Sequence, residues 1–228
     1  WSDNTLAKLK NSSGIQVWKF SLDFSEEQTG HYFRELPDHE QNYACHLKNP
    51  SRRRQFIISR AILRRLLAKY LHTDSQTLEF CKNQYGKPSL NRESLTERNS
   101  ELENRYRQCE FNLSHSNQFA LLGISTIGKL GIDIQHHRRR LNVCKFARRF
   151  FTRTESRLID SLPDDKKQQV FFQLWTRKEA VLKSLGQGIS YGIAKLDVSE
   201  AIHTDSTIAI KTNNKIYSVV NLPMNDTG

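Results

Sequence analysis

The sequence predicts a mixed α/β fold, because strand-like and helix-like segments follow one another along the whole chain. Residues 15–24 (IQVWKFSLDF) alternate apolar and polar side chains, which is typical of a half-buried strand. Residues 52–72 carry apolar side chains at helical spacing. Residues 111–116 (FNLSHS) and 119–125 (FALLGIS) indicate two strands joined by a turn. These observations favour a protein that mixes helices and strands.

The segment 52–72 is a strong helix prediction. On a helical wheel its apolar stripe consists of six side chains: Phe56, Leu63, Leu66, Leu67, Tyr70 and Leu71. Arg53, Arg60 and Arg64 line one flank of this stripe. Guanidinium groups in such a row can hold phosphate. Taken alone, the segment favours an exposed face that keeps the helix soluble.

The remaining elements follow from local composition. Residues 90–109 are polar and charged, so we expect a loop there. The segment KLGIDI (129–134) predicts a short buried strand, followed by a basic loop at residues 136–140. Two helices are predicted over 146–159 and 168–185. After Gly186 the pattern returns to short strands, in LDVS, TIAIK and IYSVV.

Composition and charge narrow the possible classes of function but do not identify one. The 228 residues carry a formal net charge of +11, from 35 Lys and Arg against 24 Asp and Glu. This charge suits nucleic acid, an anionic membrane, a phosphorylated ligand or an acidic protein, and it also fits a solvated basic surface. No apolar run reaches the roughly 18 residues of a membrane span, and residues 1–30 show no secretory pattern. The four widely spaced cysteines indicate reduced thiols and a cytoplasmic protein.

Two short segments carry side chains suited to chemistry. In GIDIQ, Asp133 and Gln135 leave the same face of the expected strand. A carboxylate at the end of a buried strand needs an ion partner or a metal. In WTRKEAVLKSLGQG, Lys178 falls within the apolar stripe, and Glu179 and Lys183 are neighbours at its edge. Taken alone, the first segment is weak evidence for a metal site, because an aspartate at the end of a strand often only caps a turn. The second segment alone favours an ordinary helical ion pair.

Taken together, these segments resemble a known family. GIDIQ, FFTRTE and WTRKEAVLKSLGQGI are similar to the signature of the 4′-phosphopantetheinyl transferase superfamily. The upstream segments GKP, FNLSHS and RRRQFIISRAILRRLLAKYL are similar to its larger, surfactin-synthetase-activator (Sfp-like) type. The matches keep the family's order from about residue 52 to residue 191, over half of the chain.

The resemblance implies an enzyme that moves the 4′-phosphopantetheine arm of coenzyme A onto a serine of an apo-carrier protein and releases 3′,5′-ADP. It places Mg²⁺, or Mn²⁺, on Asp133 and Glu179, with Gln135 as a further ligand. It gives Glu155 the role of the base that deprotonates the serine, and Lys183 the role of a cation beside the diphosphate. It assigns coenzyme A binding to six basic side chains: Arg52, Arg53, Arg60, Lys87, His115 and Lys183.

Two positions depart from the family pattern. Gln135 stands where many relatives have a glutamate, so its amide oxygen either ligates the metal more weakly or leaves that place to water. The choice between Mg²⁺ and Mn²⁺ therefore stays open. Around Tyr43, in the stretch EQNYACH, only His46 and, further on, Lys48 are basic, so one coenzyme A contact is absent or replaced.

The resemblance further implies a monomer of two similar α/β subdomains, each a small antiparallel-rich sheet packed with helices, with the active site between them. Residues 1–128 are then expected to bind the coenzyme A nucleotide, and residues 129–228 to carry the metal and catalytic groups. The expected partner is a small acidic carrier domain of acyl, polyketide or peptidyl type, without nucleic acid or membrane. Two alternatives stay open: a basic nucleic-acid-binding module without catalysis, and an inactive family member that binds coenzyme A.

Overall fold

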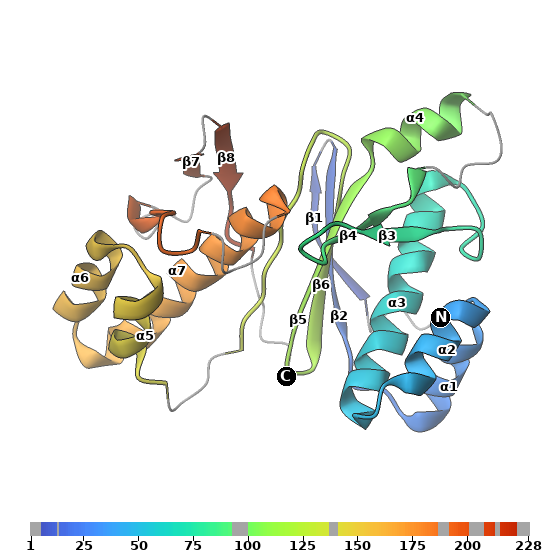
Figure 1. Ribbon diagram of the computed structural model, residues 1–228, viewed down its shortest axis with the longest axis horizontal. Helices are drawn as coiled ribbons and strands as arrows, with labels where there is room; N and C mark the ends of the chain where they lie inside the picture. The colour runs from blue at the N-terminus through green and yellow to red at the C-terminus, as the bar shows by residue number, and fades with distance from the viewer. Residues whose placement is uncertain are drawn as a thin grey trace.

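The computed structural model describes residues 6–12, 14–92, 100–136, 141–186, 192–200, 208–212 and 215–222. A central antiparallel sheet separates two groups of helices (Figure 1). One group consists of α1 (Glu26–Arg34), α2 (Asp38–His46) and α3 (Pro50–Leu71). The other consists of α5 (Val143–Phe150), α6 (Arg153–Ser161) and α7 (Asp164–Leu185). The mixed α/β fold expected from the sequence is confirmed.

The central sheet has four antiparallel strands. Their spatial order is β1 (Leu6–Ser12), β2 (Ile15–Ser21), β6 (Phe119–Ser125) and β5 (Glu110–Ser116). The strands predicted near 15–24, 111–116 and 119–125 are therefore confirmed. Buried side chains of the sheet pack on α3 and form the larger hydrophobic core, as Phe20, Leu67 and Leu122 illustrate. In this sheet β5 is an edge strand.

Helix α3 confirms the helix predicted over 52–72. The side chain of Asn49 caps its start by accepting a hydrogen bond from the backbone of Arg52 at 2.9 Å, and Pro50 lies in the first turn. Its inward face is apolar except for Ser59 and Arg64; the side chain of Arg64 is 1% exposed and donates to Glu40 at 2.7 Å. Part of the predicted arginine flank is thus buried and paired within the protein.

A second core forms in the C-terminal part of the chain. It gathers side chains of α5, α6 and α7 with those of a hairpin, β7 (Ile208–Thr212) and β8 (Lys215–Val219). The rings of Phe151, Phe171 and Trp175 contact one another: the centroid of Phe171 lies 5.0 Å from that of Phe151 and 5.8 Å from that of Trp175, and the last two are 6.2 Å apart. The predicted strands TIAIK and IYSVV are confirmed by this hairpin, whereas residues 196–199 (LDVS) form no strand. The boundary near residue 128 and the likeness of the two halves stay predictions.

Two further predictions about helices were wrong. Residues 146–159 do not form one helix, because Thr152 caps a new one: its hydroxyl accepts from the backbone of Glu155, whose carboxylate accepts from the backbone of Thr152. Residues 90–109 are not a loop throughout. They include α4 (Ser100–Gln108), a polar helix that carries an ion pair between Glu103 and Arg107.

The strand predicted over residues 129–134 was wrong: the segment 131–136 pairs with side chains instead of backbone. These described residues are assigned to no strand. The backbone amides of Ile132, Ile134 and His136 donate hydrogen bonds of 2.8, 3.3 and 2.8 Å. The acceptors are three side chains of the edge strand β5: Asn112, Ser114 and Ser116. A row of polar side chains therefore takes the place of a backbone ladder.

The structure also bears on the thiols and on membrane insertion. Cys45, Cys81, Cys109 and Cys144 are all free. Burial raises the pKa of the Cys109 thiol to about 12, so this thiol stays protonated. In the described part of the chain, no helix combines the length and the apolar character needed to cross a membrane.

Candidate active site

Gly131 allows the extended segment 131–136 to touch the backbone of α7; this contact is here called the seam. A Cβ atom built on Gly131 would lie 1.8 Å from the carbonyl oxygen of Ala180 and 2.4 Å from the amide nitrogen of Ser184. Both distances are far below van der Waals contact, so no side chain fits at this position. Glycine therefore brings the segment that carries Asp133 against the last turns of α7.

Asp133 is held from both sides of the seam. Its Oδ1 atom accepts hydrogen bonds from Nζ of Lys183 at 2.6 Å and from Oγ of Ser114 at 2.8 Å. Lys183 Nζ also lies 2.9 Å from Ser114 Oγ and donates to the carbonyl oxygen of Ile132 at 3.3 Å. The Asp133 side chain is 2% exposed. The charge of Asp133 is thus balanced by Lys183, and the bonds from Lys183 and Ser114 both end on the same oxygen, Oδ1.

Glu179 contributes a second buried carboxylate to the seam. Its Oε1 atom has no hydrogen-bond partner among the described residues. Burial raises the pKa of Glu179 to about 7; the negative charge of Asp133 acts in the same direction, and Lys183 opposes both. A buried carboxylate oxygen without a partner, close to another carboxylate, is unfavourable unless a proton or a cation binds there.

The oxygen atoms at the seam fit a hard divalent cation. Mg²⁺ prefers oxygen ligands, and carboxylates together with neutral oxygens and water are its usual shell in proteins. Besides the two carboxylates, Gln135 is close: its Nε2 atom donates to Oδ2 of Asp133 at 3.4 Å, which leaves its amide oxygen unused by that bond. Nowhere in the described ranges do three His, Cys, Asp or Glu side chains gather as a metal cluster. A metal at the seam therefore needs neutral ligands in addition to Asp133 and Glu179.

Lys87 and His115 both lie near the seam. Lys87, from the turn between β3 (Phe80–Lys82) and β4 (Pro88–Leu90), donates to the carbonyl oxygen of Leu130 at 3.0 Å. Burial lowers the pKa of Lys87, and the charge of Lys129 adds to this shift. Partial burial lowers the pKa of His115, and the neighbouring charge of Lys183 lowers it further.

The arginines predicted to bind coenzyme A make no contact with the seam among the contacts of the described residues. Arg53 donates to the carbonyl oxygens of Leu47 and Cys45, at the end of α2. Arg60 is 15% exposed, pairs with Glu40 at 3.4 Å, and lies over the ring of Phe80. The side chain of Arg52, by contrast, is exposed at the start of α3. Their assignment to coenzyme A stays a prediction.

Glu155 lies in the C-terminal core. Its side chain is 0% exposed and pairs with Nζ of Lys178 at 2.6 Å. Its Oε1 atom accepts from the backbone of Val198 at 2.8 Å, and Oε2 accepts from Thr152. A base must come within hydrogen-bond reach of the hydroxyl that it deprotonates. An enclosed carboxylate with both oxygens engaged offers no such access, so the geometry does not support the role of Glu155 as the base.

Sequence reasoning missed Ser114 as a member of the site and Asn83 as a contact to α7. Asn83 donates from Nδ2 to the carbonyl oxygen of Gly186, at the end of α7, at 2.8 Å. The signal for Ser114 was present, because polar residues at every second position of a strand that is otherwise buried indicate a bonded row. No local signal predicts the contact of Asn83, because its partner is 103 positions away.

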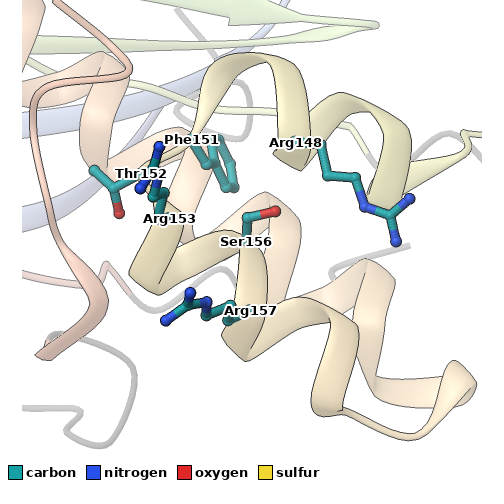
Figure 2. Close-up of a pocket in the computed structure, with 6 residues that line it drawn as sticks. All are labelled: Arg148, Phe151, Thr152, Arg153, Ser156 and Arg157. Carbon is teal, nitrogen blue, oxygen red and sulfur yellow. The ribbon is translucent and has the colours of Figure 1, made fainter.

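A surface pocket lies at the junction of α5 and α6, and its volume is about 300 Å³. Its lining consists of Arg148, Phe151, Thr152, Arg153, Ser156 and Arg157. In Figure 2 the guanidinium groups of Arg148 and Arg157 point to opposite sides, so they do not converge on one anion. None of the residues predicted for the active site lines this pocket.

The acid–base behaviour of Glu179 predicts a stability change with pH in metal-free protein. Its pKa is about 7 when folded against an ordinary value of 4.5, so the folded state binds more protons between these pH values. Stability should therefore fall as pH rises through this window, by roughly 3 kcal/mol in total from this group. Glu179→Gln should remove that slope, and should be the more stable protein at about pH 8. Urea unfolding with a chelator, at several pH values, measures this.

The control for this prediction is Glu103→Gln. Glu103 lies on the surface of α4, where its side chain is 41% exposed. Its removal should leave the pH slope of the wild type unchanged. Identical slopes for the wild type and Glu179→Gln would show that Glu179 is not protonated in the folded protein.

Comparisons with known proteins agree with the motifs. The family model for the N-terminal part of 4′-phosphopantetheinyl transferases matches residues 23–126, and that of the 4′-phosphopantetheinyl transferase superfamily matches residues 129–221. The chain is 33% identical over 217 residues to the 4′-phosphopantetheinyl transferase HetI of Nostoc sp., which covers 94% of this chain and 85% of HetI. It is 31% identical to AcpT of Escherichia coli over 64% of each chain. It is 26% identical to Sfp of Bacillus subtilis, over 68% of this chain and 61% of Sfp.

These likenesses define an enzyme of the transferase class, and its fold is mixed α/β. The chain belongs to the 4′-phosphopantetheinyl transferase superfamily. The resemblance drawn from the sequence motifs is thereby confirmed, and so is the expectation that the protein is an enzyme.

Proposed function

We propose that this protein transfers the 4′-phosphopantetheine arm of coenzyme A to a serine of an apo-carrier protein, with 3′,5′-ADP as the leaving group. The observation that carries the proposal is the seam. There the fold brings Asp133 together with Glu179 and Lys183, which lie 46 and 50 positions further along the chain. Two buried carboxylates beside one lysine suit a divalent metal and a diphosphate.

Asp133 and Glu179 are the proposed holders of a Mg²⁺ ion. Lys183 and Ser114 both bind Oδ1 of Asp133, whereas Oδ2 accepts only a 3.4 Å hydrogen bond from Nε2 of Gln135, which a bound metal would displace. Glu179 offers the unpaired Oε1 atom, and Gln135 or water supplies a neutral oxygen. When bound, the ion polarises the phosphoryl group and stabilises the negative charge on the departing 3′,5′-ADP.

Basic side chains around the seam are the proposed contacts for coenzyme A. Lys183 can exchange its bond with Asp133 for one with a diphosphate oxygen, because it is 28% exposed. Lys87 keeps its charge available to phosphate, since its partner in the structure is a neutral carbonyl oxygen. His115, exposed on β5, and Arg52, exposed at the start of α3 away from the seam, are the further contacts proposed for the nucleotide.

The proposed partner is an acidic carrier domain of acyl, polyketide or peptidyl type. The net charge of +11 supports this choice, because complementary fields speed encounter and disfavour wrong partners. We further propose that the protein works as a monomer in the cytoplasm, without nucleic acid or membrane.

The test is a transfer assay with several apo-carrier proteins. Each carrier is mixed with the protein, coenzyme A and Mg²⁺, and intact-mass measurement shows which carrier gains the arm. Matched reactions contain a chelator, or a carrier whose acceptor serine is replaced by alanine. Mass gain that needs both the metal and the serine supports the proposal. No gain on any carrier type, from a folded protein that binds coenzyme A, supports an inactive family member instead.

Replacing Gln135 with glutamate tests the departure from the family pattern. A third carboxylate near Asp133 and Glu179 should strengthen metal binding, because hard cations are held more tightly as the ligand charge rises. We expect the Mg²⁺ concentration for half-maximal transfer to fall by about tenfold, from an added ligand charge. Gln135→Leu is the control and should raise that concentration. An unchanged Mg²⁺ requirement in both variants would place residue 135 outside the metal shell.

A further inference from the structure

A buried ion pair, formed by Glu155 and Lys178, lies in the C-terminal core outside the seam. Both side chains are 0% exposed, and Nζ of Lys178 is 2.6 Å from Oε2 of Glu155. Lys178 Nζ also donates to the carbonyl oxygens of Ile193 (2.9 Å) and Leu196. The lysine thus has three partners, one from α6 and two from the chain that follows α7. Because all three donors of the ammonium group are hydrogen-bonded, its position is well defined.

The same turn of α7 carries one member of this pair and one member of the seam. Lys178 and Glu179 are consecutive, so their side chains leave the helix about 100° apart. Lys178 points into the C-terminal core, where it lies over the ring of Phe151 at 5.0 Å. Glu179 points to the seam, where the negative charge of Asp133 contributes to its raised pKa. The rotation of α7 about its axis therefore sets both positions at once.

A small rotation would be enough to disturb the seam. Side-chain ends lie roughly 5–6 Å from a helix axis, so a turn of about 10° moves a carboxylate by about 1 Å. Productive metal sites tolerate displacements of only about 0.5 Å. Lys178 donates to three fixed acceptors, and such directional bonds restrict small rotations more than non-directional apolar contacts do.

We infer that the Glu155–Lys178 pair is a positioning device, which holds α7 in the rotation that brings the carboxylate of Glu179 to Asp133. The inference rests on the proposed metal site at the seam. It gives Glu155 a role that fits its burial, in place of the role of a base. The pair costs desolvation energy, and apolar side chains of similar size often stabilise a core equally well. A role in orientation explains why charges are used here.

The test measures metal binding directly, without coenzyme A or carrier. Mn²⁺ is titrated into the metal-free protein, and free Mn²⁺ is followed by electron paramagnetic resonance. Glu155→Gln should weaken Mn²⁺ binding roughly 10- to 100-fold, as is usual when the support of a metal ligand is lost. The matched control is Glu40→Gln, which breaks the buried pair with Arg64 in the N-terminal core and should leave Mn²⁺ affinity unchanged. Circular dichroism checks that each variant is folded.

A double variant separates orientation from stability. Glu155→Gln leaves a buried lysine without its counter-ion, which destabilises the fold. Glu155→Gln combined with Lys178→Met removes both charges, so it should recover most of the stability. It still lacks the directional bonds, and its Mn²⁺ affinity should stay as weak as that of the single variant. Folded variants that bind Mn²⁺ as tightly as the wild type would overturn the inference.

Transfer kinetics distinguish positioning from base catalysis. If Glu155 positions Glu179, Glu155→Gln raises the Mg²⁺ concentration needed for turnover and leaves the shape of the pH profile at saturating Mg²⁺ unchanged. If Glu155 is the base, kcat falls at saturating Mg²⁺, the acid limb of the profile changes and Mn²⁺ affinity is kept. That second result overturns the inference. A wild-type protein that binds no Mn²⁺ overturns the proposed metal site and the inference with it, whereas the proposed function is decided separately by the transfer assay.

Discussion

Replacing Asp133 with alanine is expected to lower the rate of phosphopantetheine transfer by at least about a thousandfold, because the site loses several kcal/mol of transition-state stabilisation. Asp133 is the member of the seam that contacts both α7 and the sheet, through Lys183 and Ser114. Its loss removes a metal ligand and also releases the lysine from its place. The rate of carrier modification at saturating coenzyme A and Mg²⁺ measures the effect.

Asp160→Ala is the matched control for this experiment. Asp160 lies on the surface of α6, where it pairs with Arg148. Removing that exposed pair should change the rate by less than about twofold, because surface ion pairs contribute little. A folded Asp133→Ala protein that keeps more than about a tenth of the wild-type rate, a barrier change below 1.4 kcal/mol, would contradict the metal assignment.

Gly131→Ala is expected to abolish metal binding and to destabilise the protein by at least about 3 kcal/mol, the upper range for an overpacked site. The added methyl group would meet the carbonyl oxygen of Ala180 and the amide nitrogen of Ser184, which are backbone atoms and cannot rotate away. The segment 131–136 and α7 must then separate, and Asp133 moves away from Glu179. Thermal unfolding and Mn²⁺ titration of the same samples measure the two effects.

Gly30→Ala provides the comparison, because it makes the same chemical change where there is room. Gly30 lies within α1, and a Cβ atom there would meet only the end of the Arg34 side chain, at 3.8 Å. Alanine favours helix by up to about 1 kcal/mol over glycine, so this variant should be slightly more stable than the wild type. A Gly131→Ala protein with normal stability and normal Mn²⁺ affinity would show that the seam can open without loss.

The sequence predicted the elements whose stability is local. Helix α3 has its cap, its proline and its apolar stripe within one segment. Strands β5 and β6 follow each other in the sequence and pair as a hairpin. It failed where the deciding partner is distant: residues 132, 134 and 136 bond to side chains of β5, 20 positions earlier, in place of a strand. The break between α5 and α6 was missed for another reason, because the capping box of Thr152 and Glu155 is local and can be read from the sequence.

The candidate site shows the same division. The acidic residues of the seam were predicted as a group because their motifs resemble a family, not because local physics places them together. What the residues alone left unresolved was the difference between Glu155 and Glu179. Both were expected to be catalytic, yet one is enclosed with all its oxygens bonded and the other keeps an unpaired oxygen beside Asp133. Only packing of distant elements distinguishes two glutamates on neighbouring helices.

The bonds between segment 131–136 and the side chains of β5 determine how this segment opens locally. Segment 131–136 is attached to the sheet by bonds that its backbone amides donate to the side chains of Asn112, Ser114 and Ser116, and each bond breaks when one side chain rotates. The four-stranded sheet need not unzip for this. Backbone amides at positions 132, 134 and 136 should therefore exchange with deuterium through brief local opening, well before those of β6, which wait for global unfolding.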